Sequence, residues 1–90
     1  SGRNYYTEFA EKAPKDTVAI GCSVTVKDED GEEATYTLVG TDESAPEAGR
    51  ISVYSPLAQG LLHKKAGEKV CVEMPAGRRE FFIVKVGSPN

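Results

Sequence analysis

The segment at residues 51–75 constrains the fold most, because it places a strand, a helix and a second strand in direct succession. Ser55 is a predicted helix N-cap, since its hydroxyl can accept a backbone N–H of the first turn. Pro56 follows at the first helical position, where the missing N–H of proline costs nothing. A short helix is therefore predicted to begin at a defined residue.

This predicted helix has one apolar face and a cationic end. The residues at the spacing of one helical face are Leu57, Ala58, Leu61 and Leu62. His63, Lys64 and Lys65 follow near the C-terminal end, where positive charge complements the exposed carbonyls. Gly60 costs up to about 1 kcal/mol relative to alanine, so we expect tertiary packing, with the close approach of a strand, to stabilise the helix. Gly67 then supplies a turn.

Two segments of alternating polarity predict a β-hairpin before the helix. In the first, the residues of one parity are Val18, Ile20, Cys22, Val24 and Val26. Asp30 and Gly31 form the predicted turn, because glycine can take the positive φ that a tight hairpin requires. In the second, Ala34, Tyr36 and Leu38 face one way. The acids at residues 28–33 are interpreted as solubilising charge and edge protection instead of metal ligands or general acids.

Three further strands are predicted around the helix, at residues 51–53, 69–74 and 81–86. The last contains the apolar run FFIV, which leaves its inward parity open and is consistent with a bulge. Antiparallel strands with one central helix predict an α+β domain. The helix is expected to pack on the sheet face that carries Val24, Val26, Tyr36, Val70 and Val72.

Length and charge exclude several classes of function. Ninety residues allow one domain, and no apolar run long enough for a membrane span or a secretory signal occurs. The net charge is −3, with four Lys or Arg against eleven Asp or Glu in residues 1–49 and seven against three in residues 50–90. A negative total argues against general nucleic-acid binding. We therefore expect a cytoplasmic protein that makes no sequence-specific contact with nucleic acid and none with membranes.

The side chains that could carry chemistry have structural interpretations. Cys22 and Cys71 lie far apart without metal-ligand spacing, so neither a metal, a cofactor nor a disulfide framework is predicted, and the compartment is expected to be reducing. The single histidine, His63, stands beside two lysines at the helix end and has no paired nucleophile. Ser55 is interpreted as a helix cap in preference to a nucleophile. We do not expect an enzyme.

Three blocks, at residues 21–43, 51–70 and 73–86, resemble the C-terminal domain of the bacterial Gre transcript-cleavage factors, the GreA/GreB family. They read GCSVTVKDEDGEEATYTLVGTDE, ISVYSPLAQGLLHKKAGEKV and EMPAGRREFFIVKV. Each block is weak alone, but their order and spacing are specific. The resemblance implies an FKBP-like α+β fold, a curved antiparallel β-sheet wrapped around one short α-helix, over residues 18–87, with residues 88–90 as a tail.

The resemblance also implies a function in transcription elongation. Family members bind RNA polymerase at its secondary channel, where the C-terminal domain docks on the rim helices of the β′ subunit. An N-terminal coiled coil carries two acidic residues that help to hold a metal ion for the cleavage of backtracked RNA. Residues 1–17, with Tyr5, Tyr6 and Phe9, are expected to be the remnant of a coiled-coil helix in an isolated domain. The alternatives are a tail that packs its aromatics on the domain, and a natural stand-alone relative.

The family docking motif is an Asp or Asn followed by Ser-Pro, and it falls on Tyr54, Ser55 and Pro56. Ser55 and Pro56 match this motif. Tyr54 stands in place of the Asp or Asn and cannot accept a hydrogen bond as a carboxylate does. These three residues are the predicted polymerase contacts, and the competing interpretation is that Ser55 and Pro56 only start the helix. Because Tyr54 differs from the motif, a related group of proteins is an alternative assignment. These are the Rnk-type regulators of nucleoside diphosphate kinase, which bind polymerase without cleavage activity. Prolyl isomerase activity is not expected from the FKBP-like fold alone, since the chain has no Trp for an aromatic pocket.

Overall fold

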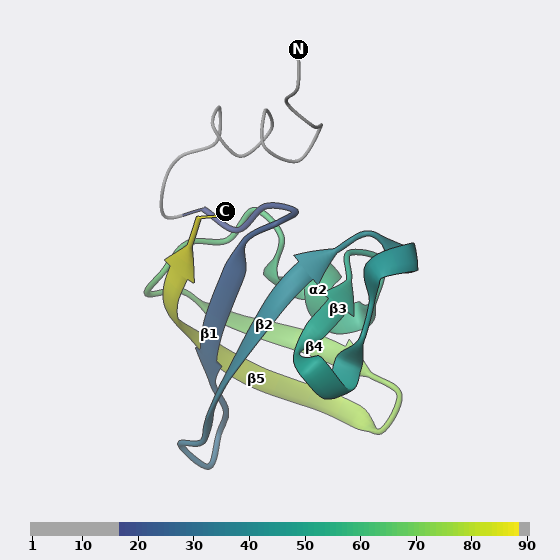
Figure 1. The fold of residues 1–90 in the computed structure, drawn as a ribbon. Coiled ribbons are helices and arrows are strands. Elements are labelled where there is room, and N and C mark those ends of the chain that lie inside the picture. The colour runs from purple at the N-terminus through teal and green to yellow at the C-terminus, as the bar shows by residue number, and fades with distance from the viewer. Residues whose placement is uncertain (1–16, 89–90) are drawn as a thin grey trace.

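The alternating segments form the central hairpin of the sheet in a computed structural model that describes residues 17–88 (Figure 1). β1 (Ser23–Lys27) pairs antiparallel with β2 (Glu33–Val39), and Val24 lies opposite Tyr36. Gly31 has a φ of 84° in the connecting turn, a conformation that glycine adopts without the steric cost of a side chain. The predicted hairpin is confirmed.

The segment before β1 turns instead of extending the strand, so β1 is shorter than the alternation predicted. The N–H of Cys22 donates to the carbonyl of Ala19 at 3.0 Å, and Gly21 between them has a φ of 90°. Val18 is nevertheless fully buried, and its N–H donates to the carbonyl of Lys64 at 2.8 Å. Burial here comes from contact with the segment after the helix, and not from a strand.

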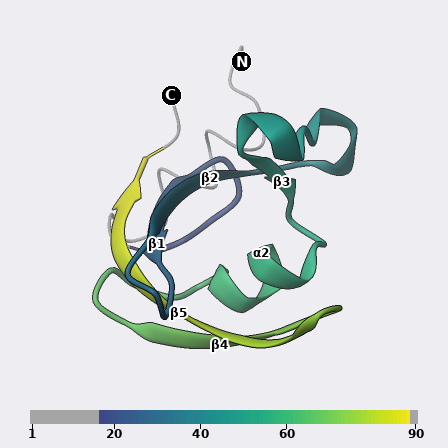
Figure 2. The same cartoon turned by 90° about the horizontal axis from the view of Figure 1, so that it is seen from below.

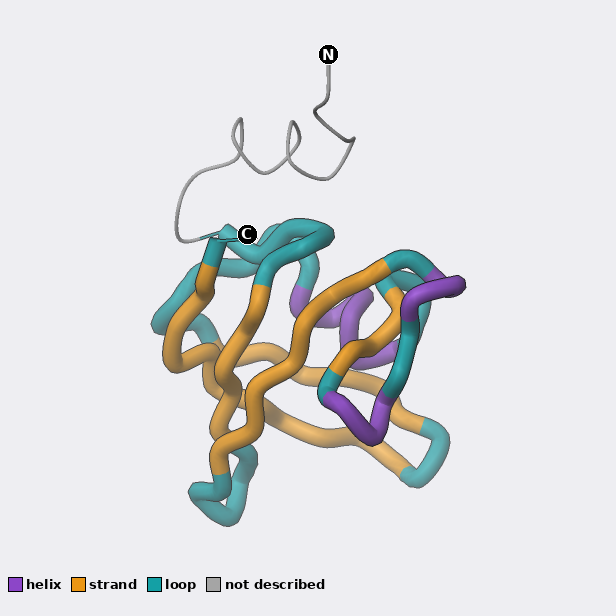
Figure 3. Tube along the Cα trace, viewed as in Figure 1, coloured by secondary structure: helices purple, strands orange, loops and turns teal. Residues whose placement is uncertain are grey.

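Three further strands complete the sheet: β3 (Arg50–Ser52), β4 (Lys69–Met74) and β5 (Gly77–Gly87). The order across the sheet is β3-β2-β1-β5-β4, and every pair is antiparallel except β2 with β3, which is parallel. The sheet is therefore mixed, where a wholly antiparallel sheet was predicted. The 3-10 turns η1 (Thr41–Glu43) and η2 (Pro46–Ala48) carry the chain across between these two strands (Figure 3), and a parallel pair requires such a crossover.

A bulge in β5 settles which residues of the FFIV run face the core. Thr25 lies opposite Lys85 and Val26 opposite Ile83, so Val84 is an extra residue on β5. The extra residue bends the strand and changes the parity beyond it. Before the bulge, Phe81 and Ile83 are buried, while Phe82 between them faces outward.

The helix α2 (Pro56–Leu61) lies inside the curl of the sheet (Figure 2). Leu57, Ala58 and Leu61 are buried, and Leu62 packs on the same core while partly exposed. The sheet residues of this core include the predicted set, of which Tyr36 is only partly buried: Val24, Val26, Val70, Val72 and Tyr36. The predicted α+β fold class and the phase of the helix are confirmed.

Gly60 lies where the helix and the sheet approach closely. A Cβ added to Gly60 would lie 2.7 Å from Cγ2 of Val72 on β4, well inside van der Waals contact. The expected close approach of a strand is therefore confirmed. Gly67 has a φ of 93°, so the predicted turn into β4 is also confirmed.

No helix within residues 17–88 is long and apolar enough to cross a membrane. The prediction that residues 1–17 belong to a coiled-coil helix, or form a tail with Tyr5, Tyr6 and Phe9, lies almost wholly outside the described residues.

Candidate partner-binding site

Ser55 fixes the corner between β3 and α2 through its hydroxyl. The Oγ of Ser55 donates to the carbonyl of Ser52 at 2.7 Å and accepts the N–H of Ala58 at 3.3 Å. Pro56 occupies the first helical turn, as predicted. Because the hydroxyl already donates one hydrogen bond and accepts another, its role in this structure is that of a helix cap.

Other side chains tie the same corner to its neighbours. The Oγ of Ser52 accepts the N–H of Tyr54 at 3.1 Å and lies 3.3 Å from Oγ1 of Thr41 in η1. Gln59 reaches back from the helix, where its Nε2 donates to the carbonyl of Val53 at 2.6 Å. The backbone around Tyr54 is therefore held from β3, α2 and η1 together.

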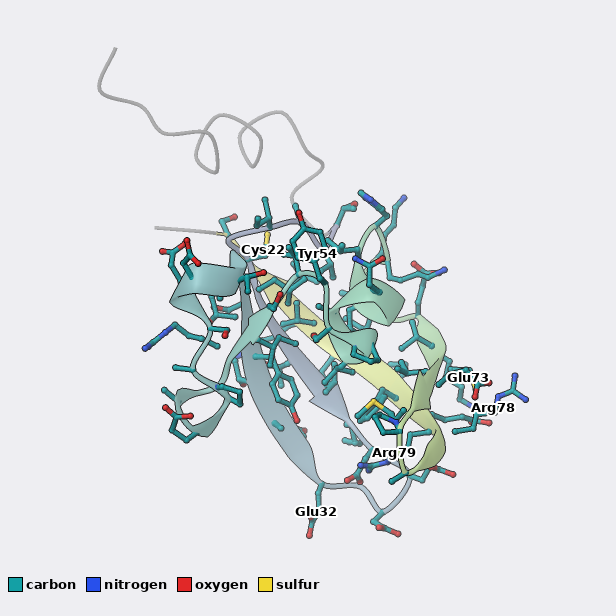
Figure 4. All side chains as sticks on the ribbon, turned by 90° about the vertical axis from the view of Figure 1, so that its right-hand side faces the viewer. Cys22, Glu32, Tyr54, Glu73, Arg78 and Arg79 are labelled. Carbon is teal, nitrogen blue, oxygen red and sulfur yellow. The ribbon has the colours of Figure 1, made fainter. Side chains whose placement is uncertain are left out.

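Tyr54 itself projects from this corner into solvent. The residue is 77% exposed, and the other exposed large hydrophobic residue among those described is Phe82, at 42%. Figure 4 shows Tyr54 at the opposite end of the molecule from Glu32, which marks the hairpin between β1 and β2. An exposed tyrosine has only two side-chain torsions to fix on binding, which favours a role in contact with a partner.

A hollow of about 380 Å³ lies beside the tyrosine. It combines apolar side chains with two carboxylates that come from η1. Its lining residues are Ile20, Gly40, Thr41, Asp42, Glu43, Val53 and Tyr54. Asp42 and Glu43 were not among the predicted contact residues, because only the crossover to β3 brings their loop beside Tyr54.

The cationic residues after the helix do not form a site. α2 ends at Leu61, so His63, Lys64 and Lys65 follow the helix instead of lying in its last turn. His63 has a φ of 69°, and its N–H donates to the carbonyl of Val18 at 2.9 Å. All three side chains are exposed, which agrees with the structural interpretation of His63.

The acids of the hairpin have a local structural role. Oδ1 of Asp28 accepts the N–H groups of Asp30 and Glu32 at 2.9 and 3.0 Å, and Oδ2 lies 3.5 Å from Nη2 of Arg79. Asp28 therefore closes the turn and ties it to β5. Within residues 17–88 no group of three or more His, Cys, Asp or Glu side chains is arranged to hold a metal ion.

Cys22 and Cys71 are both free thiols, the first buried and the second exposed. Nε of Arg78 donates to Sγ of Cys71 at 2.9 Å, across the hairpin of β4 and β5. This hydrogen bond raises the pKa of the Arg78 guanidinium. A guanidinium is cationic at physiological pH in any case, and Arg78 also pairs with Glu73 at 3.5 Å.

The architecture defines a class of protein: a small α+β domain whose curled sheet wraps around one helix and leaves a fixed, exposed corner where the helix begins. Residues 13–88 match the family described as "Transcription elongation factor, GreA/GreB, C-term". Because the match covers most of the chain, the protein belongs to this family as its C-terminal domain. The resemblance given by the three sequence blocks is confirmed.

Individual relatives agree with this assignment. The transcription elongation factor GreA of Magnetococcus marinus is 44% identical over 70 residues, which are 77% of this chain and 45% of the relative. Among solved structures, the elongation factor GreA/GreB of Nitrosomonas europaea superposes with a TM-score of 0.71 at 26% identity, over 86% of this chain and 65% of that chain. The GreA homologue Gfh1 of Thermus thermophilus superposes with a TM-score of 0.72 at 25% sequence identity. The match covers 86% of this chain and 52% of the Gfh1 chain. The chain spans about half the length of the curated relatives it matches.

Proposed function

We propose that this domain docks on RNA polymerase, on the rim helices of the β′ subunit at the secondary channel. In that position an N-terminal coiled coil of the Gre type would reach the active site and promote cleavage of backtracked RNA. The observation that carries the proposal is the exposed Tyr54, which stands on a hydrogen-bonded corner at the position of the family docking motif. Membership in a family of transcription elongation factors supports the choice of partner.

The three predicted contact residues divide into two roles. Tyr54 is the contact residue, since its side chain is exposed and free to meet a partner. Ser55 acts by shaping the corner, because its hydroxyl bonds within the domain. Pro56 starts the helix and presents an exposed ring beside Tyr54. In this proposal the domain contributes binding to polymerase, and action on polymerase would place it in the cytoplasm.

The proposal is tested by direct binding of the 90-residue chain to bacterial RNA polymerase core enzyme. The chain carries a fluorophore on an added N-terminal cysteine in a Cys71→Ser background, and anisotropy is measured as polymerase is titrated. Full-length GreA is then added as a competitor. We expect saturable binding that GreA displaces. Absence of binding at polymerase concentrations that saturate labelled GreA would overturn the proposal.

One observation favours a second function. Tyr54 stands where the family has Asp or Asn, and the Rnk-type regulators of nucleoside diphosphate kinase also lack the acid there. The same labelled chain is therefore titrated with nucleoside diphosphate kinase. Binding to the kinase would support this second function. Binding to polymerase is expected of both functions, so the kinase titration is the measurement that separates them.

A further inference from the structure

We propose that the hollow beside Tyr54 receives a basic side chain, Arg or Lys, from the docking partner. The carboxylates of Asp42 and Glu43 would pair with its charge while the tyrosine ring packs on it. This inference rests on the proposed function and adds to it the chemistry that the partner must present.

The backbone that carries the two acids is held by hydrogen bonds in η1. The N–H of Glu43 donates to the carbonyl of Gly40 at 3.0 Å, and the N–H of Ser44 donates to that of Thr41 at 3.2 Å. Nε of Arg50 donates to the backbone carbonyl of Glu43 at 3.4 Å. With the contact between Thr41 and Ser52 described above, η1 and the corner that carries Tyr54 form one connected unit.

Asp42 and Glu43 form no ion pair with another described residue. The ion pairs of residues 17–88 join Lys27 to Glu33, Arg78 to Glu73 and Arg79 to Asp28, and none includes Asp42 or Glu43. Arg50, the cation bonded to η1, uses a backbone carbonyl of Glu43 instead of its carboxylate. Two carboxylates that form no ion pair within residues 17–88 therefore line the same hollow as an exposed aromatic ring.

These features favour an occupant with a positive charge. A guanidinium or ammonium gains charge-assisted hydrogen bonds from the carboxylates and an attraction to the face of the tyrosine ring. The methylene stem of Arg or Lys suits the apolar side chains of Ile20 and Val53 in the same hollow. An acidic partner would meet two like charges.

The hollow beside Phe82 differs from the hollow beside Tyr54 in the charges that line it. It has a volume of about 320 Å³, and it is lined by charges of both signs together with the aromatic rings. Its lining residues are Lys27, Asp28, Glu29, Lys69, Glu80, Phe81 and Phe82. Because lysines and acids both line the hollow beside Phe82, it favours neither a cationic nor an anionic occupant. The charged residues that line the hollow beside Tyr54 are both acidic.

The test neutralises the two acids without changing their shape. The variant Asp42→Asn with Glu43→Gln is compared with a matched control, Asp30→Asn with Glu47→Gln, in which the same charges are removed from exposed positions outside the hollow. Affinity for RNA polymerase core enzyme is measured by the anisotropy assay over a series of salt concentrations. We expect the neutralised hollow to weaken binding about tenfold at low salt and to flatten the salt dependence. The control variant should keep the affinity and the salt dependence of the wild type.

The outcomes separate the two proposals. If the wild-type chain binds polymerase, and Tyr54→Ala weakens it while the neutralised hollow binds as tightly as the control, the basic occupant is excluded and docking stands. If the wild-type chain does not bind polymerase, both proposals fail. The single variants Asp42→Asn and Glu43→Gln, each checked by thermal melting, show whether a loss of affinity comes from charge or from a disturbed η1.

Discussion

At the scale of single residues, Gly60 shows how the sheet limits the choice of amino acid in the helix. Glycine is a poor helix former, by about 1 kcal/mol relative to alanine. Val72 of β4 nevertheless leaves no room for a Cβ at this position, since the separation from Cγ2 would be 2.7 Å. The close packing of α2 on β4 therefore depends on the absence of a side chain.

Replacing Gly60 by alanine should destabilise the domain by about 1–3 kcal/mol, because overpacking outweighs the gain in helix propensity. The free energy of unfolding is measured in urea. The same substitution in a Val72→Ala background should cost less, since the clashing methyl group is gone. A Gly60→Ala domain more stable than the wild type would show that helix and strand do not approach as closely as described.

Ser55→Ala tests whether the cap is structural. Loss of the hydroxyl should lower the free energy of unfolding by about 1 kcal/mol, as for other N-caps, and leave polymerase affinity per folded molecule unchanged. Ser44→Ala is the matched control, because Ser44 is exposed and only its backbone N–H bonds to η1. Unchanged stability together with weaker polymerase binding would instead make Ser55 a direct contact.

At the scale of elements, the helix is held by its buried face. Leu61 is fully buried and belongs to the core cluster that joins α2 to the sheet. Leu61→Ala should destabilise the domain by about 2–5 kcal/mol, as deletion of a buried leucine does. Lys64→Ala, at an exposed position, should change stability by less than about 0.5 kcal/mol. A loss for Leu61→Ala as small as that of the control would mean that the helix buries another face.

The elements that sequence could predict are those in which one local pattern decides the structure. Period-two alternation gave β4 and the hairpin, and Ser55 with Pro56 gave the start of α2. Alternation could not show that the chain turns at Gly21, because Val18 and Cys22 are buried there by tertiary contacts and keep the pattern of a strand. The parallel direction of β3 was also hidden, since three residues carry no signal of direction and the crossover through η1 and η2 decides it.

At the scale of the whole molecule, the candidate site combines residues that are distant in sequence. Tyr54, Ser55 and Pro56 could be predicted, because they are adjacent and resemble a family motif. Asp42 and Glu43 could not, because their position beside Tyr54 depends on the path of the crossover. Among the acids of residues 17–49, Asp42 and Glu43 line this site, whereas Asp28 of the hairpin makes local hydrogen bonds.

The central claim is that the domain binds polymerase through the corner at Tyr54. The most direct measurement is the affinity of Tyr54→Ala for RNA polymerase core enzyme, with thermal stability measured in parallel. Phe82→Ala is the matched control, because Phe82 is the other exposed large hydrophobic side chain of residues 17–88 and lines a different hollow.

We predict that Tyr54→Ala keeps the wild-type melting temperature and weakens binding by about 1 kcal/mol or more, which is about fivefold in Kd. Phe82→Ala should bind as the wild type does per folded molecule. If Tyr54→Ala lowers stability and leaves binding per folded molecule unchanged, Tyr54 belongs to the core and the polymerase contact lies elsewhere on the domain.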